Sequence, residues 1–490
     1  MGLCGTKDGG RAMTKMWQHQ QEALAWVLEQ FEKGLPALLD MGMGTGKTRI
    51  ACEIIAAKHP KGSSARILVG CPRAVIDAWA TTQIPRWLPD YRVLALTQGT
   101  SKKKADAIEA ALADTSPLIV VGNYESLWRM PVTLKTKWSL VVWDEVHRLK
   151  AVRGSASKWA AKMAKAHSQA HFLGMSGTLL AHSPLDAFGV WRAVGHETWG
   201  RSFTSFKATF AITNPAIPGM VMGWRNQQQM SKRIAETTFR RTTEQVIKWL
   251  PELTHGMLEF DLAPEEARVY RELLKEFASE VEQGTITPAN AMVGVLRGLQ
   301  VCGGFVGLDD DGTVRRSVKL TSRPSKQGRF GEMLTDLDPS EPLVVFCRFR
   351  DDIDSVIAEC NTHGRSVSEL SGKLNQLAQW QAGETNTLVT QIQSGGIGID
   401  LTRASMGVFY SVGHSLSEFL QAVARLHRPG QERATRLYSL VARIPGTQSP
   451  SLERRVYEAL KERKNVIDTI LDGYRRQRAT AAQGAGEHSH

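Results

Sequence analysis

The chain has 490 residues, more than one hydrophobic core usually supports, so two or three domains are expected. Lysine and arginine total 61 against 49 aspartate and glutamate, and the resulting net charge of +12 suits a polyanionic partner such as nucleic acid. The six cysteines form no C-x-x-C pair, no histidine pair has zinc spacing, and the longest apolar runs are strand-sized. A disulfide framework, a structural zinc site and a membrane span are therefore not indicated.

Strand-like apolar runs alternate with helical patterns through the first part of the chain. Helices such as 48–58 and 102–113 fit between strands expected at 37–39, 67–70, 93–96, 118–121, 140–143 and 171–173. This alternation predicts βαβ units and a parallel sheet covered by helices. The pattern resumes at 343–346, 387–390, 407–410 and 436–440, which predicts a second α/β domain.

The middle of the chain differs from both ends, because helical and irregular segments dominate there, including 264–283 and 288–302. A last helix is expected over 451–472. The predicted organisation is a flexible leader at 1–14, a first lobe at 15–184, helical protrusions and a linker at 185–325, a second lobe at 326–474 and a disordered tail at 475–490.

A glycine-rich loop, Asp-Met-Gly-Met-Gly-Thr-Gly-Lys-Thr at 40–48, follows an apolar run and opens a helical segment. Glycines let main-chain N–H groups point at phosphate oxygens, and the helix N-terminus adds its dipole. Lys47 would meet the β and γ phosphates of ATP, and Thr48 would bind Mg²⁺. The strict pattern has glycine where Met41 stands. A dinucleotide-binding turn is the alternative, but it needs no Gly-Lys-Thr ending.

An acidic pair, Asp144 and Glu145, ends an apolar strand. Asp144 would deliver a carboxylate to Mg²⁺, and Glu145 would face the attacking water. Acidic pairs at strand ends are common and often only solvated, so the prediction depends on the loop that contains Lys47.

Two arginines, Arg425 and Arg428, lie almost four hundred residues beyond that loop. On a helix this spacing would direct both guanidinium groups from one face. Phosphoryl transfer needs cations for the charge that develops as the bond breaks, so both residues are candidate arginine fingers. The alternative is ordinary ion pairing on a surface helix.

Further segments occur in one order along the chain, around and between these two sites. They are Gln20 to Trp26, Cys71 to Arg73 with Trp79, Asn123 to Glu125, Ser176 to Thr178, Phe346 to Phe349, Gln393 to Thr402 and Gln421 to Gln431. Together they resemble the Swi/Snf-type ATPases of the superfamily-two helicases over roughly residues 16–472. The ending Arg-x-His-Arg-x-Gly-Gln is the most discriminating, because DEAD-box RNA helicases end this motif differently.

The resemblance implies two RecA-like lobes and a role for each matching residue. It assigns catalysis to Lys47, Asp144, Glu145, Arg425 and Arg428; ATP binding to Gln20 (which would read adenine), Gly44, Thr45, Gly46, Lys47, Thr48 and Asp400; Mg²⁺ to Thr48 and Asp144; coupling to His147, Ser176, Thr178 and Gln421; and DNA contacts to Arg73, Asn123, Arg348, Ser394 and Thr402. The DNA-contact residues fall on loops after strands, where open α/β sheets bind ligands. For each of these residues taken singly, an ordinary position on a solvated loop explains the sequence about as well as a DNA contact.

Three residues depart from the family pattern. Motif III usually reads Thr-Gly-Thr-Pro, but Ser176 and Leu179 take its first and last places. His414 stands where the family has a tryptophan thought to couple ATP to DNA movement. These departures concern coupling more than ATP binding.

The predicted function is an ATP- and Mg²⁺-dependent DNA-dependent ATPase that translocates on duplex DNA without sequence preference and remodels protein–DNA or branched DNA structures. The alternatives are a true strand-separating or branch-migrating helicase on DNA or RNA, and an ATP-gated DNA-binding assembly module with incidental turnover. The size of the chain suggests a minimal core of phage or bacterial type. The expected location is the cytoplasm, or the nucleus if the source is eukaryotic.

Overall fold

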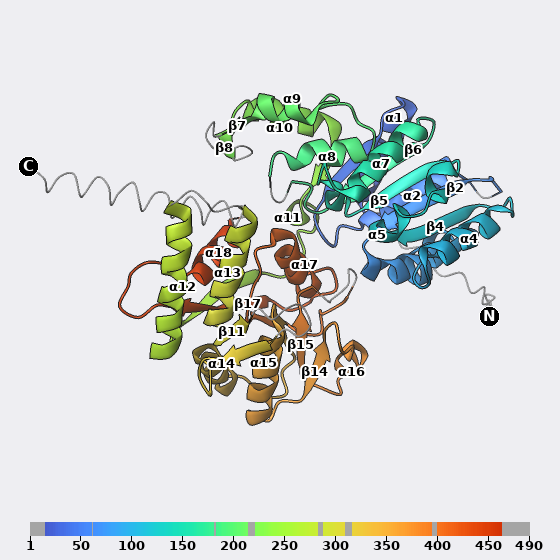
Figure 1. Cartoon of the computed structure of the whole chain (residues 1–490). Coiled ribbons are helices and arrows are strands. Elements are labelled where there is room, and N and C mark those ends of the chain that lie inside the picture. Colours follow the sequence, from blue (N-terminus) through green and yellow to red (C-terminus); the bar gives the residue numbers. More distant parts are fainter. Residues whose placement is uncertain are drawn as a thin grey trace, which may run out of the picture. The chain divides into compact units, whose positions relative to one another are not determined.

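The computed structural model describes residues 15–60, 62–180, 183–213, 221–282, 288–308, 316–393 and 399–462. It divides into two compact units, each with its own parallel sheet (Figure 1). Unit 1 contains residues up to 177 and 188–246, and unit 2 contains 178–187 and the chain from 247 onward. The prediction of two parallel α/β domains is confirmed. The expected leader and tail lie outside the described residues.

Unit 1 is built on a seven-stranded sheet in the order β3-β4-β2-β5-β6-β1-β9, in which every neighbouring pair is parallel. Its central strands are continuous apolar runs because helices cover both faces of the sheet. The strands are β1 (Ala37–Met41), β2 (Arg66–Cys71), β3 (Arg92–Ala95), β4 (Leu118–Asn123), β5 (Leu140–Asp144), β6 (His171–Ser176) and β9 (Phe239–Arg241).

The helices of unit 1 connect these strands and extend beyond them. Those of the sheet domain are α1 (Gln18–Glu32), α2 (Lys47–Lys58), η1 (Arg73–Val75), η2 (Ala78–Gln83), α3 (Ile84–Trp87), α4 (Ser101–Leu112), α5 (Tyr124–Leu127), α6 (Val132–Lys135), η3 (Val146–Leu149) and α7 (Ser155–Ala166). A separate extension consists of α8 (Asp186–Ala193), α9 (Phe203–Phe210), the hairpin β7 (Ala211–Thr213) and β8 (Val221–Trp224), and α10 (Gln227–Thr237). It has an aromatic core in which Trp199 makes edge contacts with Trp191, Phe206 and Phe210.

Unit 2 is built on a six-stranded sheet in the order β10-β17-β16-β13-β15-β14, again entirely parallel. Its strands are β10 (Leu253–Asp261), β13 (Leu343–Cys347), β14 (Val367–Leu370), β15 (Thr387–Gln391), β16 (Met406–Phe409) and β17 (Thr435–Arg443). A small antiparallel hairpin contains β11 (Phe305–Leu308) and β12 (Arg316–Lys319). The helices are α12 (Pro264–Glu282), α13 (Pro288–Cys302), α14 (Ser325–Thr335), α15 (Arg350–Thr362), α16 (Leu377–Ala382), α17 (Leu416–Leu426) and α18 (Leu452–Lys461).

The segment between the sheets is less purely helical than expected. It supplies the last strand of each sheet: β9 pairs with β1, and the nine-residue β10 pairs along its whole length with β17. Residues 242–252, which include α11 (Thr243–Val246), connect these two strands. The described contacts thus divide the chain after Val246, within the predicted linker.

Helix α18 is fastened to the core of unit 2 by a buried ion pair. Lys326 on α14 pairs with Glu453, and both side chains are fully buried. The second oxygen of Glu453 accepts a hydrogen bond from the N–H of Ala442 at 2.9 Å. Burial of such a pair is costly unless its remaining oxygens are also hydrogen-bonded, and here the main chain of β17 meets that need.

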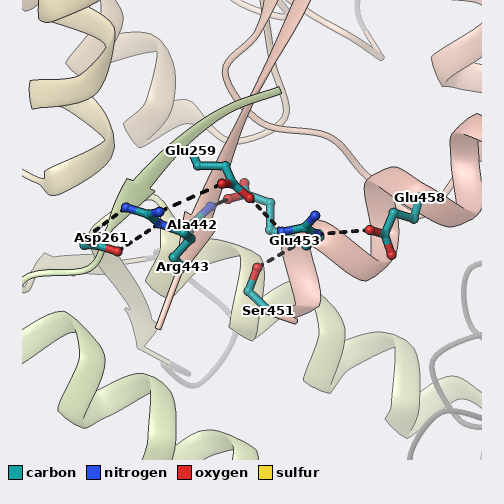
Figure 2. A network of polar contacts seen from close by, with 8 residues as sticks. Glu259, Asp261, Ala442, Arg443, Ser451, Glu453 and Glu458 are labelled. Atoms are coloured by element: carbon teal, nitrogen blue, oxygen red, sulfur yellow. Dashed lines mark hydrogen bonds and ion pairs between the residues drawn. The ribbon is translucent and has the colours of Figure 1, made fainter. Parts of the chain in front are cut away.

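Surface ion pairs extend this attachment to the edge strand β10 (Figure 2). Arg454 on α18 lies 2.7 Å from Glu259 and 3.0 Å from Glu458, and Arg443 on β17 lies 3.0 Å from Asp261. Charged side chains of this kind also protect an edge strand from pairing with another chain. The last predicted helix, 451–472, is described only to residue 462, beyond which it lies outside the described residues.

Among the residues that the structure describes, no helix is both long enough and apolar enough to cross a membrane.

Candidate active site

The predicted site residues of unit 1 gather at one edge of its sheet. Because all strands are parallel, the carboxyl ends of β1, β2, β4, β5 and β6 share that edge. Lys47 follows β1 and Arg73 follows β2, while Asn123, Asp144 and Ser176 are the last residues of β4, β5 and β6. Residues far apart in sequence therefore lie at the same edge of the sheet, as the prediction of an ATP site requires.

The glycine-rich loop is closed on itself by its lysine. The Lys47 Nζ donates hydrogen bonds to the carbonyl oxygens of Met41 at 2.8 Å and Gly42 at 3.1 Å. Gly44 and Gly46 have φ angles of 76° and 84°, a left-handed conformation that favours glycine. Helix α2 begins at Lys47, directly after the loop. An ammonium group, a loop of glycine main chain and the N-terminus of a twelve-residue helix fit a polyphosphate.

Helix α1 packs two side chains against this loop. The Gln20 Nε2 donates to the Thr45 carbonyl oxygen at 3.1 Å, and the Gln20 Oε1 accepts from the Trp17 N–H at 3.0 Å. The His19 Nε2 lies 2.9 Å from the same Thr45 oxygen. The sequence did not indicate His19. A Cβ on Gly46 would lie 2.2 Å from the Gln20 amide, so any larger residue would displace it. The adenine-reading role of Gln20 stays a prediction.

The loop is also attached to the end of β9. The N–H of Gly42 donates to the Arg241 carbonyl oxygen at 2.9 Å, and the Thr243 Oγ1 donates to the Met43 carbonyl oxygen at 2.9 Å. Arg241 pairs with Glu22 on α1 at 2.9 Å. The phosphate loop therefore contacts both the start of the chain and the segment that leaves unit 1.

Asp144 lies buried at the end of β5. Its Oδ2 accepts a hydrogen bond from the Trp79 Nε1 at 2.9 Å, and its carbonyl oxygen accepts from the Tyr124 hydroxyl at 2.6 Å. Burial and the neighbouring charge of Glu145 raise the pKa of Asp144 to about 6, against the opposing effects of Trp79 and Lys47. A cation bound at this carboxylate would reverse that shift.

Glu145 is held by a hydroxyl and an imidazole. Ser176 Oγ donates to its Oε2 at 3.1 Å, and His147 Nδ1 lies 3.2 Å from that oxygen and 2.8 Å from the Ser176 hydroxyl. Burial raises the pKa of Glu145, but the hydrogen bond and charge of His147 and the charge of Lys47 outweigh it and leave the pKa lowered. Serine thus retains the hydroxyl of the family's threonine at this position. Leu179, the other departure in this motif, is buried.

A Mg²⁺ ion fits this donor set. Thr48 in the first turn of α2 and Asp144 offer the hard oxygen ligands that Mg²⁺ prefers, and Mg²⁺ commonly takes few protein ligands together with phosphate and water oxygens. Within the described ranges, no group of three or more His, Cys, Asp or Glu could hold a metal by itself. A Mg²⁺ ion bound by Thr48 and Asp144 would complete its coordination with phosphate or water oxygens.

The two predicted DNA contacts of unit 1 differ in availability. Arg73 is exposed at the start of η1. Asn123 is buried, and its Nδ2 donates to Glu125 Oε2 at 2.9 Å, while Glu125 also pairs with Arg148. Contact between Asn123 and a phosphate would require that bond to open. Both roles stay predictions.

In unit 2, the expectation that Arg425 and Arg428 share one face of a helix is wrong. Helix α17 ends at Leu426, and His427 leaves helical geometry with ψ 85°. Pro429 disfavours a helical conformation for the residue before it, which is Arg428. The His427 imidazole lies 2.7 Å from the Pro251 carbonyl oxygen and fixes this turn.

The two arginines consequently lie in different surroundings. Arg425, in the last turn of α17, is 6% exposed, and burial lowers its pKa to about 10. Arg428 donates from Nη1 to the Ile399 carbonyl oxygen at 3.3 Å, and its Nε is buried with no hydrogen-bond partner in the described part of the chain. Gln431 donates to the Ala404 carbonyl oxygen at 2.8 Å and so joins the end of the segment 421–431 to the chain just after the segment 393–402.

Two of the predicted coupling residues, Gln421 and Thr178, contact Ser417 in the first turn of α17. Gln421 Nε2 donates to Ser417 Oγ at 3.4 Å, and Thr178, which groups with unit 2, donates to the same oxygen at 3.5 Å. Asp400 Oδ1 accepts from the N–H and the hydroxyl of Thr402 at 2.9 and 2.7 Å, forming a local turn. Ser394, a predicted DNA contact, lies outside the described residues.

Arg348 is held by an acidic residue that the sequence did not indicate. Its Nη1 lies 3.0 Å from Glu418 Oε2, and its N–H donates to Ser411 Oγ at 2.8 Å. His414 is close by: burial and the charge of Arg348 lower its pKa, and its Nδ1 is buried with no partner among the described residues. The only sequence signal for Glu418 is that it is the one acidic residue of α17.

Comparison with known families decides the kinship of the chain. The SNF2-related domain matches residues 19–302, which is more than half of the chain, and the helicase conserved C-terminal domain matches residues 326–430. The chain belongs to the SNF2-related family. This confirms the predicted enzyme class, an ATP hydrolase of helicase superfamily two. The phage or bacterial minimal type and the individual site roles stay predictions.

Similar proteins differ in source and length. "Chromodomain-helicase-DNA-binding protein 1-like" of Danio rerio is 21% identical over 98% of this chain and 46% of its own length. "Putative ATP-dependent helicase/translocase YwqA" of Bacillus subtilis is 22% identical over 92% of this chain and 48% of its own length. The chain thus spans about half the length of these relatives. The Hef helicase domain of Pyrococcus furiosus aligns with a TM-score of 0.52 at 16% identity, covering 91% of this chain and 98% of that one, which shows a shared fold.

Proposed function

We propose that this SNF2-related chain is a motor that hydrolyses ATP when bound to duplex DNA and moves along it without sequence preference. One observation carries the proposal: the buried pair Asp144 and Glu145 lies at the sheet edge that bears the Lys47 loop, and the charge of Lys47 acts on both carboxylates. Family membership and the net charge of +12 support a nucleic-acid partner. Such a partner implies a compartment that contains DNA.

Each residue of unit 1 has a distinct part in this proposal. Lys47 and the glycine loop bind the β and γ phosphates, and Thr48 with Asp144 would hold Mg²⁺, which neutralises phosphate charge when bound. Glu145, kept ionised by His147 and fixed by Ser176, accepts a hydrogen bond from the attacking water and orients it.

The arginines of unit 2 supply positive charge for the transition state. Arg425 is desolvated, which strengthens its interaction with an anion because water screens it less. Arg428 is held at the same end of α17 through Ile399. Since positive charge is required only as the phosphoryl group transfers, these residues affect turnover more than ATP affinity.

The DNA track is assigned to Arg73, Asn123, Arg348, Ser394 and Thr402. Contacts from such residues to phosphate oxygens position a duplex and carry no sequence information. Binding should therefore weaken steeply with salt and vary little with sequence. Remodelling of protein–DNA complexes or branched DNA is the further activity proposed for the motor.

The test combines two assays on the full chain. ATP hydrolysis is measured with duplex, single-stranded and branched DNA and with RNA, and displacement of a third strand from a triplex is measured with ATP. We expect strongest stimulation by duplex DNA and ATP-dependent displacement. Equal rates with and without every nucleic acid would contradict the proposal, whereas preference for single strands or forks would favour a strand-separating or branch-migrating helicase.

His414 favours one alternative of another class. A neutral imidazole replaces the family's tryptophan at a position linked to coupling, which would suit an ATP-gated DNA-binding module with incidental turnover. Such a module would bind DNA and hydrolyse ATP but leave the third strand in place.

A further inference from the structure

Glu418 connects three segments of unit 2 through one carboxylate. Its Oε2 lies 3.0 Å from Arg348 Nη1, which follows β13, and its Oε1 accepts from Gln393 Nε2 at 3.3 Å, which follows β15. Glu418 itself is in the first turn of α17, where the Ser415 hydroxyl caps its N–H at 3.3 Å. Both the main-chain N–H and the carboxylate of Glu418 are therefore held by neighbouring side chains.

The carboxylate also shares a helix face with Arg425. Positions 418, 421 and 425 recur at three and four residues, which places Glu418, Gln421 and Arg425 on one side of α17. The negative charge of Glu418 acts on the Arg425 guanidinium and opposes the effect of its burial. One acidic residue thus acts on a predicted DNA contact and a predicted arginine finger.

An ordinary surface ion pair would not transmit such an effect, because water screens it. Here the side chains of Arg348 and Glu418 are only 14% and 30% exposed, so much of their interaction is protected from solvent. While Arg348 pairs with Glu418, it neutralises most of the carboxylate's charge. If a DNA phosphate captured the Arg348 guanidinium, that charge would act more strongly on the rest of α17.

We propose that Glu418 is a positioning residue that reports DNA occupancy at Arg348 to Arg425. This inference rests on the proposed function, since it needs DNA to stimulate hydrolysis. Glu418 competes with a DNA phosphate for Arg348 in the free protein, and it acts on Arg425 when DNA has taken Arg348. It touches neither substrate, and it acts through the two arginines.

The test compares Glu418→Gln with wild type and with Glu384→Gln, a matched control that removes the same charge from an exposed residue of unit 2. Two quantities are measured: the duplex concentration that gives half-maximal ATPase stimulation, and the ratio of the saturated rate to the DNA-free rate. Glu418→Gln should lower the half-saturating concentration by about two- to fivefold, because Arg348 is released. It should also lower the ratio by about fivefold or more.

Arg348→Gln and the double variant separate coupling from structure. Once Arg348→Gln is present, adding Glu418→Gln should change the ratio little, because the two residues act as one unit. A purely structural loss would lower both rates together and leave their ratio unchanged, which would overturn the inference. So would equal effects of Glu418→Gln in the presence and absence of Arg348.

The two proposals fail in different ways. If wild type and Glu384→Gln are stimulated by DNA and Glu418→Gln matches them in both quantities, only the role of Glu418 is wrong. If wild type itself is not stimulated by any DNA, the proposed motor function is wrong and the role of Glu418 falls with it.

Discussion

Each unit buries a charged candidate site residue, and the two charges have opposite signs. In unit 1, burial raises the pKa of Asp144 to about 6, and in unit 2 it lowers the pKa of Arg425 to about 10. Both shifts express the same physics, since a low-dielectric environment disfavours the charged form of either group. An opposite charge would stabilise the charged form of each group: a bound cation that of Asp144, and a phosphate that of Arg425.

The units also differ in how they hold those groups. Unit 1 holds its two carboxylates by separate side-chain hydrogen bonds, from Trp79 to Asp144 and from Ser176 to Glu145. Unit 2 places Arg425 at the very end of a helix and Arg428 beyond it. In the proposed function, unit 1 binds ATP in its ground state, and the arginines of unit 2 act chiefly as charge develops.

Substitution of Arg425 is the most direct test of the different roles proposed for the two units. Arg425→Ala should lower kcat by about 10³-fold or more while ATP affinity changes little, because positive charge is needed mainly in the transition state. Turnover and binding of a fluorescent ATP analogue are measured side by side, with the exposed Arg436→Ala on β17 as control. Loss of ATP affinity in Arg425→Ala would indicate a role in the ground state or in folding.

Substitutions in unit 1 test the other half of the comparison. Glu145→Gln should slow hydrolysis by about 10²- to 10⁴-fold and retain ATP binding, since it removes the group that orients water. Lys47→Ala should lose affinity as well as turnover, because Lys47 lies in the phosphate loop. Lys58→Ala at the other end of α2 is the control. Normal turnover in both variants would refute the site assignment.

The buried ion pair of unit 2 has no counterpart in the proposed chemistry, so it should affect stability alone. Lys326→Met or Glu453→Leu should each destabilise unit 2 by about 3–5 kcal/mol, because one charge remains buried without its partner. The double variant should recover much of that loss. Hydrogen exchange of α14 and α18 measures the effect. Equal destabilisation by the double variant and the sum of single variants would show that the pair is not coupled.

The smallest expected effect concerns Asp352 on α15, which faces Lys326, Ser411 and Glu453. Burial raises its pKa to about 6 from 3.8, so the folded state binds its proton more tightly than the unfolded chain. The free energy of unfolding should therefore fall by about 1–3 kcal/mol as pH rises from 4 to 6, and then level off. Chemical denaturation across this range should show a flatter profile for Asp352→Asn.

Asp354→Asn, an exposed neighbour on the same helix, is the control for that profile. An Asp352→Asn profile that parallels wild type and the control would show that Asp352 does not carry this pH dependence.

Much of the fold could be predicted because central strands of parallel sheets are continuous apolar runs. The predicted strands at 67–70 and 343–346 differ from β2 and β13 by one residue at their ends. The edge strands β9, β10 and β14 were missed: β9 has three residues, β10 is largely half-buried with polar residues among its apolar ones, and β14 has two apolar residues. Such strands are defined by their pairing partners, which local sequence does not reveal.

The candidate site residues could be predicted from motifs, but the residues that hold them in place could not. Trp79 meets Asp144 across 65 residues of sequence, and Glu418 meets Arg348 across 70. Tertiary structure alone brings such pairs together. The sequence does carry a signal that Arg425 and Arg428 do not share a helix, because Pro429 disfavours helical geometry at Arg428.

The connection between β9 and β10 has a fixed maximum length. Its two ends are paired into different sheets, so neither strand can lengthen it without losing hydrogen bonds. Eleven residues, 242–252, lie between them, and even a fully extended chain of that length spans about 40 Å. Arg241 and Leu253 cannot separate beyond that distance in any conformation that keeps both strands paired, and Thr243 attaches the start of this connection to the phosphate loop.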